Sequence, residues 1–180
     1  TGQTITSAGK TFGSHIYFNG TGGGWTLQDA FSSTTKNVYL QRGDLNTNSQ
    51  NFTTYAFLSN YTLTRSLTLG ASNVTCTGSG ADGTYGTVAW SMAGSGYTFS
   101  AGTSTINISS TSSAELYTGN QSYNIVIFQS VSATQNLTGG VFFSSVLFKG
   151  TTGNVTTTNA TINALTFQQV GNTGGNGNIY

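Results

Sequence analysis

Charged residues are scarce in this sequence. Of its 180 residues, five are Lys or Arg and four are Asp or Glu, so 5% are charged. A soluble domain usually has about 25%. A net charge of +1 supplies neither the phosphate contacts that nucleic acids require nor a basic surface for anionic lipids. We therefore expect no nucleic-acid partner.

Groups that perform acid–base chemistry or bind metals are also few. They are His15, Cys76, Asp29, Asp44, Asp82 and Glu115. Catalysis and metal binding need such groups in clusters, whereas the four carboxylates lie far apart in the sequence. We predict that the chain is not an enzyme and has no cofactor or metal site. A polysaccharide-degrading enzyme is the weakest alternative, because a fold could still align some of the carboxylates.

Long apolar runs are missing as well. No run approaches the roughly 18 residues of a membrane helix, so we expect no membrane insertion. The first residue is Thr1 rather than Met, as expected of a processed chain or an excised domain. The sequence nevertheless contains 11 Phe, 9 Tyr and 2 Trp, which a disordered linker lacks. The chain can therefore bury a core, and its length predicts one domain.

Strand-forming and turn-forming residues make up most of the chain. It contains 33 Thr, 22 Ser, 25 Gly and 17 Asn, with no Pro. Apolar and polar residues alternate over short runs bounded by Gly, Asn and Ser, which predicts an all-β fold. The runs are Ser14–Phe18, Asn37–Leu40, Ser66–Leu69, Thr87–Ser91, Tyr97–Phe99, Thr105–Ile108, Tyr123–Phe128, Val141–Phe148 and Thr161–Phe167.

Several of these runs resemble one another. The segment from Val38 to Thr47 resembles the segment from Leu67 to Cys76. The pattern returns at roughly 20 to 30 residues, which is typical of a parallel β-solenoid (β-helix) with irregular coils. The repeat markers are Val38, Leu67, Tyr97, Ile125, Val146 and Leu165.

We predict one solenoid domain over residues 1–171 and a Gly/Asn-rich tail at 172–180. A β-sandwich or jelly roll is the alternative fold, because it also needs many short alternating strands. Outside the tail, Asn19-Gly20 and Asp82-Gly83 are the only Asn-Gly or Asp-Gly hairpin signals.

One segment departs from strand alternation. Thr26 is placed as an N-cap with Asp29 three residues later, and Leu27, Ala30 and Phe31 follow helical spacing. This pattern predicts a short helix near residues 26–31 that would cap the open end of the solenoid. A tight loop is the alternative.

Four stretches carry a resemblance to known proteins. They are Tyr17–Phe31, Thr64–Ser72, Ser100–Ile106 and Ile162–Phe167. They resemble the Thr/Asn/Gly-rich β-helix repeats of bacteriophage structural or tail-associated proteins and of bacterial surface adhesins. The resemblance covers most of the chain and implies a β-helix displayed at a surface. It does not separate a virion protein from a cell-surface protein.

Some sequence features suggest binding, each with an ordinary structural alternative. Arg42-Gly43-Asp44 spells the tripeptide that integrins read, but it falls at an expected coil corner where Gly supplies the turn. Chance and strand alternation account for most of the nine Asn-x-Ser/Thr sequons, although surface glycosylation would use the same motif. The sequons begin at Asn19, Asn51, Asn60, Asn73, Asn107, Asn120, Asn136, Asn154 and Asn159.

Threonines and aromatic residues offer two further hypotheses. Thr-x-Thr pairs on successive coils would form a flat array suited to ice, because stacked strands repeat every ~4.8 Å. The pairs are Thr4/Thr6, Thr62/Thr64, Thr75/Thr77, Thr103/Thr105 and Thr156/Thr158. Aromatic rings could stack on sugars, although most rings in a small β-protein belong to the core. The candidates are Trp25, Trp90, Tyr39, Tyr61 and Tyr117.

Cysteine and histidine each occur once in the chain, and both residues are predicted to be structural. Cys76 lies in an alternating run and should be a small buried side chain. His15 should be a hydrogen-bonded surface residue.

The function predicted from the sequence is a non-catalytic structural or adhesive module of a surface-displayed assembly. We expect it outside the cell, on a virion or bacterial surface. Its expected partners are further copies of itself or other structural proteins of the same assembly. An ice- or glycan-binding solenoid is the alternative.

Overall fold

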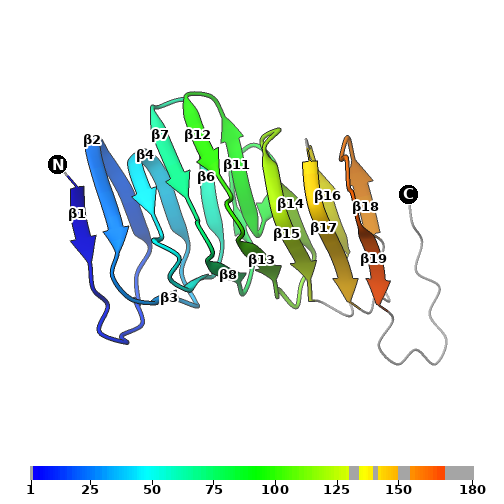
Figure 1. Ribbon diagram of the computed structural model, residues 1–180, viewed down its shortest axis with the longest axis horizontal. Coiled ribbons are helices and arrows are strands. Elements are labelled where there is room, and N and C mark those ends of the chain that lie inside the picture. The colour runs from blue at the N-terminus through cyan, green and yellow to red at the C-terminus, as the bar shows by residue number, and fades with distance from the viewer. Residues whose placement is uncertain (1, 130–133, 140–141, 150–154, 169–180) are drawn as a thin grey trace.

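The computed structural model describes residues 2–129, 134–139, 142–149 and 155–168. The chain forms a parallel β-solenoid of about seven turns (Figure 1). The prediction of an all-β parallel β-helix is therefore confirmed, and the alternative of a β-sandwich or jelly roll is wrong. The C-terminal tail predicted at 172–180 lies outside the described residues.

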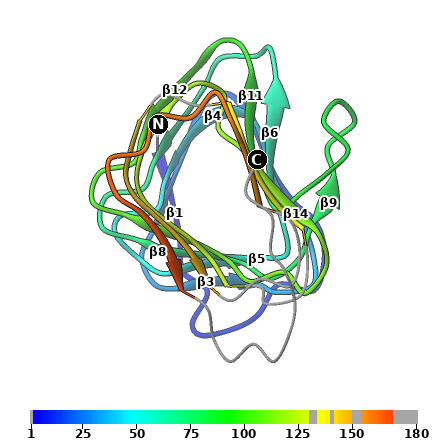
Figure 2. The same cartoon turned by 90° about the vertical axis from the view of Figure 1, so that its right-hand side faces the viewer.

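The coils enclose the core with three faces, which give the molecule a roughly triangular outline (Figure 2). Face 1 contains the first parts of β2 (Ile16–Leu27) and β4 (Val38–Asn46), then β6 (Phe57–Tyr61), β11 (Trp90–Gly94), β14 (Ala114–Tyr117), β16 (Gln135–Thr138) and β18 (Val155–Thr158). Face 2 contains β1 (Gly2–Ile5), the second parts of β2 and β4, β7 (Arg65–Thr68) and β12 (Tyr97–Ser100). Face 3 contains β3 (Phe31–Ser33), β5 (Phe52–Thr54), β8 (Asn73–Cys76), β13 (Thr105–Ile108), β15 (Ser122–Phe128), β17 (Phe142–Lys149) and β19 (Leu165–Gln168).

The coils have two sizes. Coils between residues 16 and 108, here called the wide coils, have strands on all three faces. Coils between residues 114 and 168 are here called the narrow coils; in their described residues, the chain passes from a face 1 strand to a face 3 strand without a separate strand on face 2. Among the described strands, β12 pairs with β7 only, so face 2 ends at β12. The cyan and green wide coils extend beyond the yellow and orange narrow ones in Figure 2.

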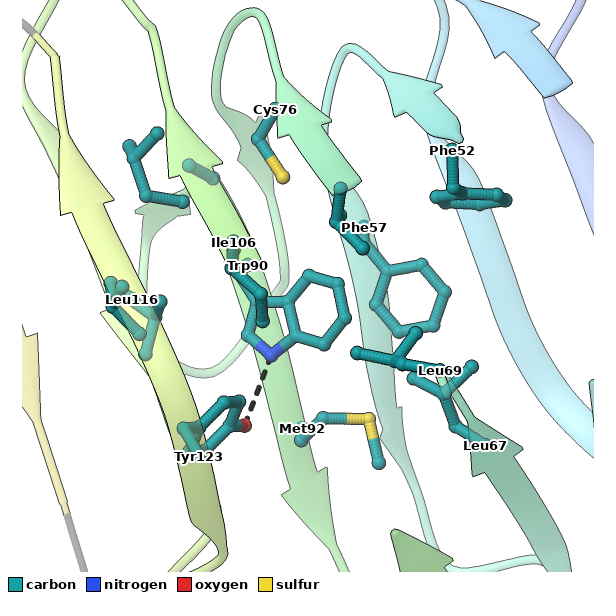
Figure 3. Packing of buried hydrophobic residues seen from close by; sticks show 14 of the residues in the cluster. Phe52, Phe57, Leu67, Leu69, Cys76, Trp90, Met92, Ile106, Leu116 and Tyr123 are labelled. Atoms are coloured by element: carbon teal, nitrogen blue, oxygen red, sulfur yellow. Dashed lines mark hydrogen bonds between the residues drawn. The ribbon is translucent and has the colours of Figure 1, made fainter. Parts of the chain in front are cut away.

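A ladder of apolar side chains runs through the interior along face 1. Val38 stacks on Phe57, Phe57 on Trp90, and Trp90 on Leu116, from the wide coils into the narrow ones. These side chains are fully buried, and the rings of Phe57 and Trp90 stack with their centroids 4.5 Å apart (Figure 3). Because each coil buries its inward residues on its neighbours, the core is continuous along the axis.

The polar atom of the buried indole has a partner. Trp90 Nε1 donates to Tyr123 Oη at 3.0 Å, and that hydroxyl donates to the carbonyl of Thr118 at 3.1 Å (Figure 3). Both of these buried donors, the Trp90 indole N–H and the Tyr123 hydroxyl, therefore have an acceptor, as a stable interior requires. The bond also joins the last wide coil to the first narrow one.

The short helix predicted near residues 26–31 is wrong. β2 continues through Leu27, the chain bends at residues 28–29, and β3 begins at Phe31. The reason is pairing, because Thr26 and Leu27 lie beside Thr4 and Ile5 of β1. No helix occurs in the described part of the chain, and hence none there could cross a membrane.

Asp29 caps a neighbouring turn rather than a helix. Its two carboxylate oxygens accept the N–H groups of Ser7 and Ala8, both at 2.7 Å. The bond from the Ser7 N–H is the main cause that lowers the pKa of Asp29. Asp29 therefore binds the turn of the preceding coil, and Thr26, the predicted N-cap, is a residue of strand β2.

The repeat alignment between Val38–Thr47 and Leu67–Cys76 does not give the stacking register. Leu67 lies beside Leu45, and Val38 lies beside Phe57. Later in the chain, Val146 does stack on Leu165, as the markers predict. A pattern of period two matches at several offsets, so the sequence alone does not decide which offset the coils adopt.

Both hairpin signals mark places where the chain leaves the regular coil. Asp82-Gly83 forms the turn of an antiparallel hairpin between β9 (Gly80–Ala81) and β10 (Thr87–Val88), which projects from the solenoid (Figure 2). Asn19-Gly20 lies where β2 shifts register against β4. All nine predicted strand runs overlap a strand; the strands missed are mostly short ones such as β3 and β5.

Candidate functional site

The outer surface of face 2 carries an aligned row of hydroxyl and amide side chains. Thr4, Thr26, Asn46, Thr68 and Ser100 occupy one register position on five successive coils. They point outward because their neighbours in sequence, including Leu27, Leu45 and Leu67, are buried. We call this set the hydroxyl row.

A second row lies beside it, formed by Gly2, Gly24, Asp44, Ser66 and Thr98. Ser66 Oγ donates to Asp44 Oδ1 at 2.6 Å, which fixes the carboxylate on the surface. Strand spacing places neighbouring members of each row about 4.8 Å apart. The two rows cover face 2 with short side chains that are polar at every position except the glycines Gly2 and Gly24.

The tripeptide Arg42-Gly43-Asp44 lies at the corner between face 1 and face 2. Within β4, Val38 and Tyr39 pair with β6, whereas residues 43–46 pair with β7, so the strand turns between them. Gly43 has a φ of +86°, and a Cβ added there would lie 2.6 Å from the carbonyl oxygen of Gly23. The predicted coil corner with glycine supplying the turn is confirmed.

This corner contains a hollow of about 320 Å³. β2 contributes Thr21, β4 contributes Arg42 and Asp44, and the loop from β6 to β7 contributes Leu63 and Thr64. Arg42 is half-buried, and its Nη1 donates to Thr21 Oγ1 at 2.6 Å. A cation, a carboxylate, two hydroxyls and an apolar side chain therefore share one concave surface, which we call the corner hollow.

The Thr-x-Thr pairs do not form the array that the sequence suggested. Thr105 stacks on Asn73 rather than on Thr75, and the pair Thr62/Thr64 lies in the β6–β7 loop. The pairs are therefore spread over different faces. Apart from Thr4, the hydroxyl row consists of residues outside these pairs, one from each coil, which a search for i, i+2 pairs within one strand could not find.

The aromatic residues proposed to stack on sugars differ in how far they are exposed. Trp90 is fully buried, so the hypothesis that it stacks on a sugar is wrong. Tyr39 is half-buried beneath Tyr17, whose ring stacks on it at 4.7 Å and is 56% exposed. The exposed ring on face 1 is therefore Tyr17, which the sequence analysis did not select.

The projecting hairpin covers another part of face 1. The ring of Tyr85 stacks on that of Tyr117 with centroids 3.7 Å apart, and the side-chain hydrogen bond with Tyr85 raises the pKa of Tyr117 to about 12. Leu58 points outward yet is only 2% exposed, because it packs in a small cluster with Val88. The hairpin thus shields an apolar part of the outer wall.

Arg65 is a buried cation that the sequence analysis did not single out. It is 2% exposed, and its guanidinium donates to the side chain of Ser59 and to several backbone carbonyls, among them Tyr61, Ser95 and Ala93. Burial lowers the pKa of Arg65. The side chain joins the corners of two adjacent wide coils, so its role is structural.

The remaining candidates lie apart. Cys76 is fully buried, and burial raises the pKa of its thiol to about 12, which confirms a structural cysteine. His15 is exposed and accepts the N–H of Asn37 at 3.1 Å, as predicted. Within the described ranges, no three His, Cys, Asp or Glu side chains lie together where they could hold a metal ion.

The described sequons lie on strands of faces 1 and 3, at the register shift of β2, and in the connections between strands. Asn19, Asn51, Asn73, Asn120 and Asn159 are exposed, and Asn60, Asn107 and Asn136 are half-buried. Asn154 lies outside the described residues.

Comparison with known proteins adds no relative. No protein-family model matches this chain, and no curated protein or solved structure is detectably similar to it.

Proposed function

We propose that the chain is a non-catalytic structural and adhesive module of an assembly displayed at a surface, either a phage virion or tail or a bacterial cell. The resemblance of its Thr/Asn/Gly-rich repeats to such proteins favours this role. Expected partners are further copies of the chain or other structural proteins of the assembly.

The observation that carries the proposal is the continuous core. The ladder from Val38 through Trp90 to Leu116 joins wide and narrow coils, and the hydroxyl row on face 2 consists of hydroxyl and amide side chains. A solenoid with such a core is a rigid rod, since each coil is fixed by its neighbours. Neutral polar side chains keep the rod hydrated without a strong charge pattern.

Immunogold electron microscopy tests the proposed location. Antibodies raised against the purified chain are applied to intact cells and virus particles from its source, with antibody pre-absorbed on the chain as the control. Gold on the outer surface is expected. Gold confined to the cytosol or to the interior of particles would contradict the proposal.

A second candidate function is ice or glycan binding through face 2. The specific observation in its favour is the hydroxyl row, which presents one short polar side chain per coil on a flat wall. A regular, uncharged array of this kind suits ice or the hydroxyls of a polysaccharide chain.

Replacing Thr68 with Tyr tests this second function, because the larger ring breaks the flat row. Thr158→Tyr, at an exposed position on face 1 of a narrow coil, is the matched control. Thermal hysteresis, or retention on a glycan array, should be lost in the first variant and kept in the second. If the unaltered chain has neither activity, this candidate is excluded.

A further inference from the structure

The corner hollow has chemistry that the flat rows lack. Arg42 provides a guanidinium, and its bond to Thr21 uses one of five N–H donors, so the others can bind a ligand. Asp44 provides a carboxylate whose Oδ1 is held by Ser66. A site with a guanidinium and a carboxylate suits a ligand that has an anionic group for the guanidinium and hydrogen-bond donors for the carboxylate.

The other walls narrow the ligand class. Leu63 is 36% exposed and offers an apolar surface, while Thr21 and Thr64 offer hydroxyls that both donate and accept. A pocket with an apolar wall and a few placed polar groups is typical of a small-molecule site, and about 320 Å³ lies within the usual range of size. A sugar ring has an apolar C–H face and a rim of hydroxyls.

We infer that the corner hollow binds a uronic acid residue of an acidic polysaccharide. Arg42 pairs with the sugar carboxylate, since a guanidinium matches a carboxylate with two parallel hydrogen bonds. Asp44 Oδ2 accepts a hydrogen bond from a hydroxyl of the sugar ring, and Leu63 packs against the C–H face of that ring. The inference rests on the proposed adhesive role and names the ligand class for it.

The position of the hollow fits a polymer rather than an isolated sugar. Asp44 and Ser66 belong to the outer row of face 2, which continues to Thr98 on the next wide coil. A polysaccharide leaving the hollow would therefore meet further short polar side chains along the same wall. The hollow supplies charge recognition, and the rows supply neutral hydrogen bonds.

Polygalacturonate is the probe, and its fully methyl-esterified form is the neutral control. Isothermal titration with the purified chain should detect binding to polygalacturonate and little to the ester. Arg42→Gln should weaken binding by at least about tenfold, because it removes a charge-assisted pair. Lys10→Gln makes the same change in net charge at an exposed site elsewhere and should leave binding unchanged.

A second variant distinguishes loss of the binding site from loss of the fold. Thr64→Tyr fills the corner hollow but retains every charge, so it should also abolish binding while circular dichroism stays unchanged. Equal binding to both polymers, equal loss in the Lys10 variant, or full binding by the Thr64 variant would overturn the inference. Because the assay uses purified chain, its result does not depend on where the protein is located. Surface display without polygalacturonate binding would overturn this inference alone. Binding without surface display would overturn the proposed function alone.

Discussion

The wide and narrow coils share a core but differ in their outer wall. Wide coils add a face 2 strand, and with it the hydroxyl row, the corner hollow and the buried Arg65. Narrow coils connect β14 to β15 through residues 118–121 without that strand. The difference indicates that the core provides stability along the whole rod, whereas the features suited to binding belong to the wide coils.

The largest effect should come from breaking the core where the two kinds of coil meet. Trp90→Ala removes a fully buried indole and its bond to Tyr123, and should lower the free energy of unfolding by about 3–5 kcal/mol. Chemical denaturation measures the change. Trp25→Ala is the control, because Trp25 is only half-buried and should cost clearly less. Equal losses would contradict a core that is continuous through Trp90.

Loss of Arg65 should affect the wide coils selectively. Arg65→Met leaves the buried carbonyls of Ser59 and Ala93 without that donor, so we expect a cost of about 2–4 kcal/mol. Hydrogen exchange should show faster opening in β7 and β12 than in β14 and β16. Uniform loss of protection in wide and narrow coils would contradict a local role.

Gly43 offers a smaller test of the corner. Gly43→Ala forces a Cβ to within 2.6 Å of a backbone oxygen at a positive φ, and should cost about 1–3 kcal/mol. Gly83 has a similar φ of +84° in the hairpin, with no atom near the added Cβ. Gly83→Ala should therefore cost less, and the difference in melting temperature measures the close packing of the corner.

The smallest effect on stability should follow changes in the hydroxyl row. Thr68→Val keeps the shape and β-branching of a half-buried outer side chain, so the free energy of unfolding should change by no more than about 0.5 kcal/mol. Thermal denaturation checks this. A large loss would mean that the row stabilises the fold instead of serving recognition.

The sequence predicts the core better than it predicts the outer sites. Alternation in β17 reveals the inward residues Val146 and Phe148, because burial on a strand has period two. The hydroxyl row depends on which residue of one coil lies above which residue of the next, as with Asn46 and Thr68. That register also depends on corners and insertions. The Asp82-Gly83 signal marks where the hairpin turns, but it does not show how the coils align on either side of it.

The corner hollow shows the same limit at a single site. Arg42 and Asp44 attract attention in the sequence as parts of a tripeptide, and the coil corner at Gly43 follows from that glycine. Thr21 and Leu63 lie on adjacent coils and come together with them only when the coils stack. Neither has a sequence signal that links it to Arg42.

The division between a shared core and a binding wall on the wide coils can be tested in one titration. Amide chemical shifts of the isotope-labelled chain are recorded by NMR as an oligogalacturonate is added. The account predicts changes concentrated at Thr21, Arg42, Asp44 and Thr64 and extending along the rows of face 2, with β14, β16 and β18 unaffected. Changes centred on the narrow coils, or no change at any residue, would contradict it.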